Sequence, residues 1–452
     1  MASTYLKRTP SQAGSATKGT FSAWVKRGNV STGYPRLFHQ FISSNNYLEI
    51  FFSNGDELQL DCNAGGSNRA VVRTNRKFRD PNSFYHIMIS IDSTQSTASD
   101  RIKFYVNGVQ ETSFAATTYP GSGEDMKING STGTVYIGQS GANNQYFDGS
   151  MSHMHWIDGT AYTPSAFGET DATTGEWKAK TSPSVTYGTN GFLILKDGNT
   201  ITDQSSNSNA FTLGGGTLTD LKDNPDNVFC SFNPLIYSSN NSTFSITNNR
   251  VVAGTANWRQ QGCTMGIAQN QGKYYWEMKG VTGSSFNGLI GIKDVFYANT
   301  GNYNLPTGYN STAGYGISYG KGGELYVNGT STSSWGASYV VGSIISVAFD
   351  ADNMKLYFAK DGAWQNSGVP TSGSTGTGAI NVATTGAGEN VWLPFVTAHG
   401  GGWDCNFGNG FFGTTAITTN SGNGYSGAEG SSKFNYTVPT GYSALSTKGL
   451  NE

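Results

Sequence analysis

Apolar and polar residues alternate along most of the chain in short runs that end at turn-forming residues. In residues 102–106 every second residue is Ile, Phe or Val, and the run stops at Asn107-Gly108. Residues 84–91 form a similar run that breaks at a polar segment. A period of two predicts β-strands, and the absence of any long run at helical spacing predicts almost no helix. The best helical candidate is one short turn at residues 163–167, with Pro164 near its start.

One β-hairpin is predicted with particular clarity in the second half of the chain. Residues 341–350 and 354–364 are two apolar-alternating segments around a polar turn, and the second contains Asp361-Gly362. Together with residues 272–278 upstream and 392–396 downstream, this hairpin resembles the core of a SPRY domain. The resemblance implies a binding sandwich and carries no catalytic chemistry. Within it, Trp276 and Trp392 are expected in the core.

The first half has an ordered series of short apolar motifs of its own. The series resembles a concanavalin A-like, laminin G-type jelly roll over roughly residues 3–213. Its members are residues 20–26, 84–89, 102–108, 135–138, 147–149, 155–157 and 191–195.

The two motif series predict an all-β protein of two tandem β-sandwiches, because many short strands with frequent turns are typical of sandwiches. The length of 452 residues suits two domains. We expect a laminin G/concanavalin A-like jelly roll at 1–213, a polar linker at 214–242, and a SPRY-like sandwich with a C-terminal extension at 243–452.

The amino-acid composition limits the classes of partner and the cellular location that we expect. Only 13% of residues are charged, the formal net charge is -2, and no Lys/Arg-rich run exists, so we expect no nucleic-acid partner. No apolar stretch is long enough for a membrane helix, and residues 1–8 lack the apolar core of a secretory signal. Four cysteines without metal-type spacing predict buried, reduced thiols and synthesis in a reducing cytoplasm: Cys62, Cys230, Cys263 and Cys405.

Two phrases outside the sandwich motifs resemble virion proteins of marine bacteriophages. They are residues 223–235, after the first domain, and residues 438–450, near the C-terminus. The resemblance implies a structural or adhesive part of a phage particle: a fibre, tail appendage or capsid-attached protein made in the host cytoplasm. Its partners would be other virion proteins and a host surface glycan or receptor, with the chain present as a homo-oligomer or in many copies.

The sequence patterns typical of catalytic sites are weak in this chain, and we expect that the protein is not an enzyme. Gly316-Ile-Ser318-Tyr-Gly320 matches a nucleophile elbow, but its alternation predicts a strand without the required following helix. Glycosidases need two facing carboxylates. Asp56-Glu57 and Glu124-Asp125 are adjacent pairs that would point to opposite faces of a strand. The sequence does not show whether carboxylates from distant strands face each other. The second hypothesis is therefore a glycan-depolymerising virion enzyme, and the third is a secreted cellular lectin.

Metal sites are expected to be absent, with calcium left open. Asp92, Asp100 and Asp148 are candidate calcium ligands by analogy with laminin G-type domains, although solvated turn aspartates are the favoured interpretation. His153 and His155 would share a face within one strand, but ordinary packing is favoured over a metal pair because no third ligand is evident.

Aromatic residues in polar, Gly- and Asn-rich loops are the best candidates for ligand binding. Sugar rings stack on Trp and Tyr faces, and in SPRY domains the loops at one end form the ligand surface. Packing within the fold is the alternative for each residue. The candidates are Tyr297, Tyr303, Tyr309, Trp335 and Trp403.

Overall fold

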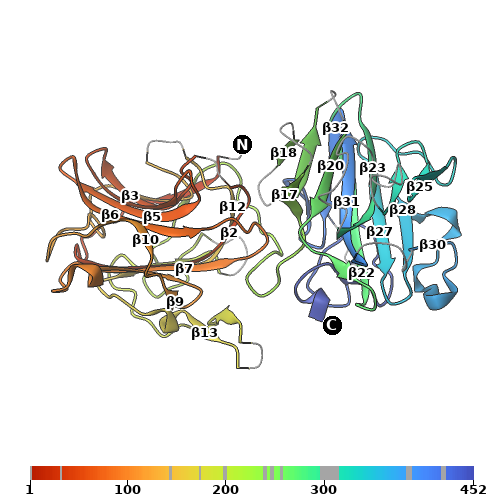
Figure 1. Cartoon of the computed structure of the whole chain (residues 1–452). Coiled ribbons are helices and arrows are strands. Elements are labelled where there is room, and N and C mark those ends of the chain that lie inside the picture. The colour runs from red at the N-terminus through yellow and green to blue at the C-terminus, as the bar shows by residue number, and fades with distance from the viewer. Residues whose placement is uncertain are drawn as a thin grey trace. The chain divides into compact units, whose positions relative to one another are not determined.

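The computed structural model forms two compact units, Met1–Asp220 and Leu221–Glu452. Figure 1 shows the strands of both units. Each unit is built around two large, mainly antiparallel sheets, which confirms the predicted all-β pair of sandwiches. No helix among the described residues is long and apolar enough to cross a membrane. The structure describes residues 3–30, 33–141, 145–172, 175–196, 201–237, 242–244, 249–254, 258–295, 315–382, 389–418 and 424–451.

The larger sheet of the first unit has eight strands, and every neighbouring pair is antiparallel. Its strands follow in the spatial order β10 (Phe114–Thr118), β6 (Ser67–Lys77), β5 (Glu57–Ala64), β4 (Asn46–Phe52), β3 (Arg36–Ser43), β11 (Thr134–Ile137), β1 (Tyr5–Arg8) and β16 (Thr212–Gly215).

The second sheet of this unit has six strands, and a small two-stranded sheet and two short 3-10 helices accompany it. Helix η2 falls inside the predicted turn at 163–167. The six strands are β15 (Phe192–Ile194), β12 (Gly149–Asp158), β2 (Lys18–Arg27), β7 (Tyr85–Asp92), β8 (Ile102–Val106) and β9 (Val109–Gln110); the others are β13 (Gly168–Thr170), β14 (Trp177–Ala179), η1 (Ala98–Asp100) and η2 (Pro164–Ala166).

The core of the first unit lies between the two sheets, and the period of two explains how each strand contributes to it. In β5, Leu58, Leu60 and Cys62 are fully buried, whereas Gln59 and Asp61 are only half-buried. Successive side chains of a strand point to opposite faces. The polar residues of β5 therefore lie on the outer face of the eight-stranded sheet.

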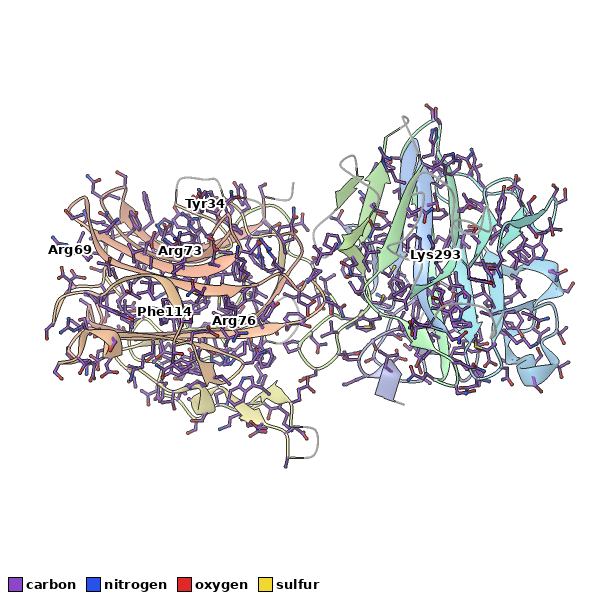
Figure 2. The ribbon with its side chains drawn as sticks, viewed as in Figure 1. Tyr34, Arg69, Arg73, Arg76, Phe114 and Lys293 are labelled. Carbon is purple, nitrogen blue, oxygen red and sulfur yellow. The ribbon has the colours of Figure 1, made fainter. Side chains whose placement is uncertain are left out.

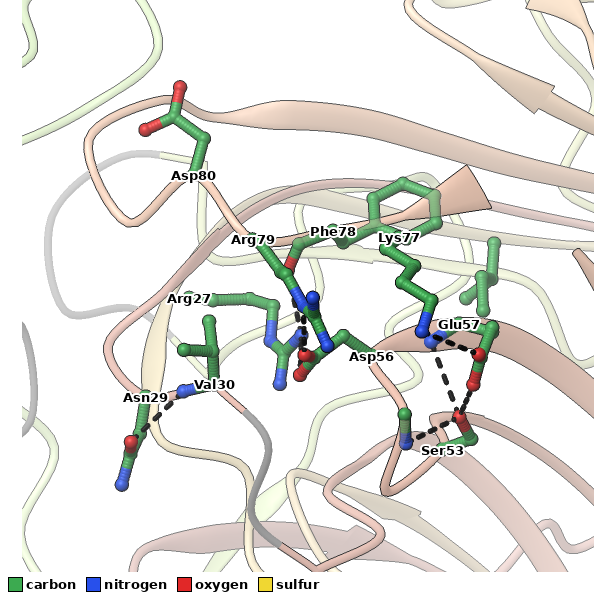
Figure 3. Close-up of polar contacts among 12 residues, drawn as sticks. Arg27, Asn29, Val30, Ser53, Asp56, Glu57, Lys77, Phe78, Arg79 and Asp80 are labelled. Carbon is green, nitrogen blue, oxygen red and sulfur yellow. Dashed lines mark hydrogen bonds and ion pairs between the residues drawn. The ribbon is translucent and has the colours of Figure 1, made fainter. Parts of the chain in front are cut away.

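A buried ion pair closes one end of this core. Arg27 Nη1 donates to Asp56 Oδ1 at 2.8 Å and to the Phe78 carbonyl oxygen at 2.7 Å, and Arg79 Nε donates to Asp56 Oδ2 at 2.7 Å (Figure 3). The Arg27 and Asp56 side chains are both fully buried. Burial lowers the pKa of Arg27, and Asp56 opposes that shift. The carboxylate thus supplies the counter-charge that a buried guanidinium needs.

The first sheet of the second unit places β31 and β23 at its centre. Their register pairs Gly291 with Phe395 and Lys293 with Leu393. The strands are β17 (Phe232–Tyr237), β20 (Arg259–Cys263), β31 (Val391–His399), β23 (Asn287–Asp294), β24 (Gly316–Gly320), β25 (Leu325–Val327) and β26 (Thr330–Thr332), with β21 (Ile267–Ala268) also on β31.

The second sheet of this unit contains the predicted hairpin, as β27 and β28 in antiparallel register. Trp276 in this sheet and Trp392 in the first are fully buried, as predicted. The sheet comprises β18 (Ser242–Phe244), β19 (Arg250–Ala253), β32 (Gly401–Asn406), β22 (Lys273–Val281), β27 (Ile344–Asp350), β28 (Lys355–Lys360), β29 (Ala363–Trp364), β30 (Ile380–Asn381) and β35 (Ser443–Ala444); the smaller elements are β33 (Phe411–Phe412), β34 (Thr415–Ala416), η6 (Gln365–Ser367), η7 (Pro370–Thr375) and η8 (Gly449–Asn451).

The C-terminal segment is tied into the second unit by a buried carboxylate. Glu277 on β22 accepts hydrogen bonds from the backbone N–H groups of Asn435 and Tyr436, at 2.9 and 2.8 Å. Tyr275 and Asn406 donate to the same carboxylate. Burial nevertheless raises the pKa of Glu277 to about 7, and these hydrogen bonds oppose that shift.

The chain divides inside the predicted linker, but most of that linker is folded. Strand β16 extends to Gly215 and pairs with β1, whereas β17 begins at Phe232 and pairs with β20. Phe229 and Cys230 are buried as well. The stretch predicted as a 214–242 linker therefore contributes an edge strand and several buried side chains to the second unit. All four cysteines are buried and form no disulfide, as expected for buried thiols, whereas synthesis in a reducing cytoplasm stays a prediction.

Candidate functional site

The outer face of the eight-stranded sheet carries the richest set of polar and aromatic side chains in the first unit. The cross-strand register places His39 opposite Glu49, and Glu49 opposite Asp61. On either side of this row, Phe41 pairs with Tyr47 and Gln59 pairs with Arg73. We call this surface the outer face, defined by Tyr5, Arg36, His39, Phe41, Tyr47, Glu49, Asp61, Asn63, Arg73 and Tyr136.

An ion pair occupies the centre of the outer face. Arg36 binds Glu49 with two hydrogen bonds, from Nε to Oε2 at 2.7 Å and from Nη2 to Oε1 at 3.1 Å. Asp61 lies directly across from Glu49, and its Oδ1 accepts a hydrogen bond from the Gln59 amide at 2.8 Å. Burial raises the pKa of both Glu49 and Asp61, and Arg36 opposes the shift in each.

His39 is a neutral hydrogen-bond donor in this setting. The Gly141 N–H donates to Nδ1 at 2.9 Å, so Nδ1 is an acceptor and the ring proton resides on Nε2. Burial and the nearby Arg36 lower the pKa of His39 to about 3. The imidazole therefore stays uncharged at neutral pH and presents an N–H group.

Three buried polar atoms of the outer face have no hydrogen-bond partner among the described residues. They are His39 Nε2, Asn63 Oδ1 and Arg73 Nε. His39 Nε2 lies 3.9 Å from Glu49 Oε2, beyond hydrogen-bond distance. Unpaired buried polar atoms are rare in native structures, and ordered water or a ligand commonly satisfies them. The outer face thus offers two donors and one acceptor; Figure 2 labels Arg73 on β6.

Half-buried aromatic rings surround these polar atoms. The Tyr5 ring lies 6.1 Å from the Tyr136 ring and 6.2 Å from the Tyr146 ring. Tyr47 and Phe41 are likewise half-buried and pack edge-on against His39. Aromatic faces beside hydrogen-bonding groups suit ligands with both apolar and hydroxyl-bearing surfaces.

Of the predicted loop aromatics, three lie outside the described residues: Tyr297, Tyr303 and Tyr309. Trp335 is half-buried, and its ring packs edge-on against Tyr319 and Phe358 at 5.4 and 6.1 Å. Trp403 is fully buried in β32, and its Nε1 donates to the Thr397 carbonyl oxygen at 3.0 Å. The interpretation of Trp403 as a ligand-stacking residue is therefore wrong, because its ring has no exposed face.

Two of the three candidate calcium aspartates, Asp92 and Asp100, are held by local contacts, whereas Asp148 Oδ1 is buried without a hydrogen-bond partner among the described residues. Asp92 bonds Thr94 and Gln95 in its own turn, and Asp100 pairs with Lys103 at 3.0 Å. Burial raises the pKa of Asp148 to about 6. Among the residues that the structure describes, no group of three or more His, Cys, Asp or Glu side chains could hold a metal ion.

The two histidines of the predicted pair do not act together. The register of β12 shifts between Ser152 and His155, and His153 has φ +46°, so the assumption of a regular strand was wrong. His153 Nδ1 bonds the Ser152 hydroxyl at 2.8 Å, and His155 Nδ1 bonds the Tyr187 hydroxyl at 2.9 Å. Packing is therefore the better interpretation of His155, which is buried.

Two serine arrangements lack the geometry of a nucleophile. Ser318 lies inside β24, a strand as the alternating pattern predicts, and its side chain is fully buried. Ser22 Oγ lies 2.9 Å from His86 Nε2, but Trp177 Nε1 donates to His86 Nδ1 at 3.0 Å. His86 Nε2 must therefore carry the proton, so it donates to Ser22 and cannot take a proton from it.

Part of the first unit is similar to a superfamily that includes both lectins and glucanases. The model described as Concanavalin A-like lectin/glucanases superfamily (Laminin_G_3) matches residues 2–166. No curated protein matches the chain.

Among solved structures, two SPRY domains are similar to this chain. The SPRY domain of human HERC1 is 16% identical with a TM-score of 0.29, over 39% of this chain and 96% of its own. Another human SPRY domain is 12% identical with a TM-score of 0.28, over 37% and 95%. A heptameric SAP-like pentraxin from Limulus polyphemus is 16% identical with a TM-score of 0.28, over 43% and 89%.

Proposed function

We propose that this protein is a non-enzymatic binding protein, and that the outer face of its first unit binds a glycan. The observation that carries the proposal is the combination of half-buried rings, such as Tyr47 and Tyr136, with unpartnered polar atoms of His39, Asn63 and Arg73. Rings stack on the apolar faces of sugars, and the polar atoms bond the hydroxyl groups. The superfamily match over residues 2–166 supports a lectin-type role.

Substitution of Tyr47 tests this proposal. Tyr47→Ala should weaken binding to a glycan array by roughly 5- to 30-fold, the equivalent of about 1–2 kcal/mol for one aromatic contact. Tyr326→Ala in the second unit removes another half-buried ring and should leave binding unchanged. Equal binding by both variants and the native protein, with all three folded, would contradict the proposal.

A non-enzymatic role is favoured by the way the carboxylates are engaged. Both oxygens of Glu49 accept hydrogen bonds from Arg36, and one oxygen of Asp61 accepts from Gln59. A general acid needs a proton to give to the leaving group, and a guanidinium bound to both oxygens opposes protonation.

A glycan-depolymerising enzyme is the second candidate, because Glu49 and Asp61 face each other across neighbouring strands and burial raises the pKa of both. The discriminating measurement is reducing-end release from a broad polysaccharide panel. We expect none. If the native protein releases reducing ends and neither the Glu49→Gln nor the Asp61→Asn variant does, the protein is a glycan-depolymerising enzyme.

We further propose that the protein works on a bacteriophage particle, as a fibre, tail appendage or capsid-attached protein in several copies. The support is the resemblance of residues 223–235 and 438–450 to phrases of virion proteins. Phe229 and Leu445, one from each phrase, are both buried in the second unit, so the phrases belong to its fold. Cross-linking and mass spectrometry of purified particles should identify the chain and its neighbours, and its absence from particles would refute this placement.

A further inference from the structure

A buried lysine in the second unit lies on the side of its sheet that faces away from the core. In β23, Ile290 and Ile292 are fully buried in the core. Because strand residues alternate between faces, Lys293 points to the opposite side. It is nevertheless only 3% exposed. Figure 2 labels it.

The ammonium group of Lys293 has a neutral environment. Nζ donates to Gln260 Oε1 at 3.1 Å and lies 5.3 Å from the centre of the Phe395 ring. Within the described part of the chain, no carboxylate oxygen forms an ion pair with it. The neighbouring Asp294 accepts hydrogen bonds from the backbone N–H groups of Glu389 and Asn390 instead.

This arrangement differs from that of two buried arginines in the first unit. Arg27 is paired with Asp56 and Arg36 with Glu49, so each of these two buried arginines has its anion. An ammonium group has three N–H donors, and the structure provides one acceptor for Lys293. Burial lowers the pKa of Lys293 to about 8, which reflects the missing counter-charge. A buried cation without an anion is unfavourable, and such groups are concentrated at functional sites.

Beside Lys293 lies a small apolar cluster whose outer members are half-buried. Leu393, its register partner, and Phe395 form a small buried cluster on the same face. Ile236 and Val295 pack against that cluster and are half-buried. A ligand that approaches past these two side chains would meet apolar surface first and the ammonium group behind it.

We propose that Lys293 anchors a binding site for a small carboxylate with an apolar tail. The carboxylate oxygens accept hydrogen bonds from the free N–H groups of Nζ and supply the missing negative charge. The tail packs on Leu393 and Phe395. This site belongs to the second unit and does not depend on glycan binding by the outer face of the first.

The test uses hexanoate as the probe and hexanamide as its uncharged counterpart, on the full chain at constant ionic strength. Hexanoate should raise the melting temperature of the second unit in a saturable way, because a ligand that binds only the folded state stabilises it. Hexanamide should not. Equilibrium dialysis with labelled hexanoate should show one site per chain, with at least 10-fold weaker binding by Lys293→Met.

Variants without ligand separate this proposal from a structural role. Lys293→Met should melt at a higher temperature than the native chain, since it removes an uncompensated buried charge and keeps the apolar stem. Lys355→Met, at a half-buried lysine whose Nζ donates to Asn381 Oδ1, is the control and should change neither property. The proposal is overturned if hexanoate and hexanamide act alike, if no saturation is seen, or if Lys293→Met binds hexanoate as well as the native chain.

Discussion

At the scale of single residues, the energetic cost of burying a charged side chain depends on whether an opposite charge is paired with it. Asp56→Asn keeps the shape of the side chain and suits the positive φ of +71° at this position, but it removes the negative charge beside Arg27. We expect it to destabilise the first unit by about 3–5 kcal/mol, because a fully buried guanidinium loses its counter-ion. Urea unfolding measures the loss. Asp125→Asn, at an exposed pair with Lys127, should cost under about 0.5 kcal/mol.

Trp403 illustrates why single aromatic residues were hard to assign from the sequence. Its glycine neighbours suggested a loop, but Gly401 and Gly402 are needed because a Cβ there would lie 2.3 and 2.1 Å from backbone oxygens. The same glycines that resemble a loop allow strands to approach closely. Trp276 and Trp392 were recognised because apolar alternation surrounds them.

Trp403→Ala therefore tests packing rather than binding. The ring contacts Phe286 and Tyr339, with centroids 5.4 and 5.9 Å away. Its removal should destabilise the second unit by about 3–5 kcal/mol, as expected for a large aromatic residue in a core. Glycan binding per folded molecule should not change. A folded variant with native stability and reduced binding would contradict this assignment.

At the scale of elements, the strands themselves were predictable and their neighbours were not. The alternation in β5 places Asp61 and Asn63 on the face opposite Leu58, Leu60 and Cys62. That signal is present in the sequence. The contact between Asp61 and Glu49, however, depends on the register of β4 against β5. The position of His39 depends on the pairing of β3 with β11, which follows β3 by some 90 residues. Period-two patterns carry no information about such pairing.

The attachment of the C-terminal segment to β22 should depend on pH. The pKa of Glu277 is about 7 in the folded chain, above its ordinary value of 4.5. The folded state therefore binds the proton more tightly between these values, and its stability falls as pH rises through that window, then levels off above about pH 7. After correction for the pH dependence of the intrinsic exchange rate, hydrogen exchange at the amides of Asn435 and Tyr436 should become faster as pH rises through that window. Glu277→Gln should abolish the dependence, and an unchanged profile in that variant would refute it.

At the scale of the whole molecule, the two resemblances predicted two sandwiches, and the chain divides inside the predicted linker, but polar composition made that linker too long. Residues 220–226 contain several aspartates and a proline, which suggested a linker as far as residue 242. The apolar residues Phe229 and Phe232 come soon after and are buried in the second unit. The average composition of such a stretch does not reveal a short strand, because only a few apolar side chains determine whether that strand is buried.

This difference gives a direct test with fragments. Fragments 1–220 and 221–452 should each unfold cooperatively, since every sheet lies wholly within one of them. A fragment that starts at residue 236 should be much less stable than 221–452. It lacks the buried side chains of Phe229, Cys230 and Phe232, and it loses the hydrogen bond from the Cys230 N–H to the Leu445 carbonyl oxygen. Burial of one large apolar side chain contributes about 1.5–3 kcal/mol, so the loss is comparable to the whole stability of an ordinary domain. Circular dichroism during thermal unfolding distinguishes the cases, and equal melting temperatures for the two C-terminal fragments would show that residues 221–235 are a linker after all.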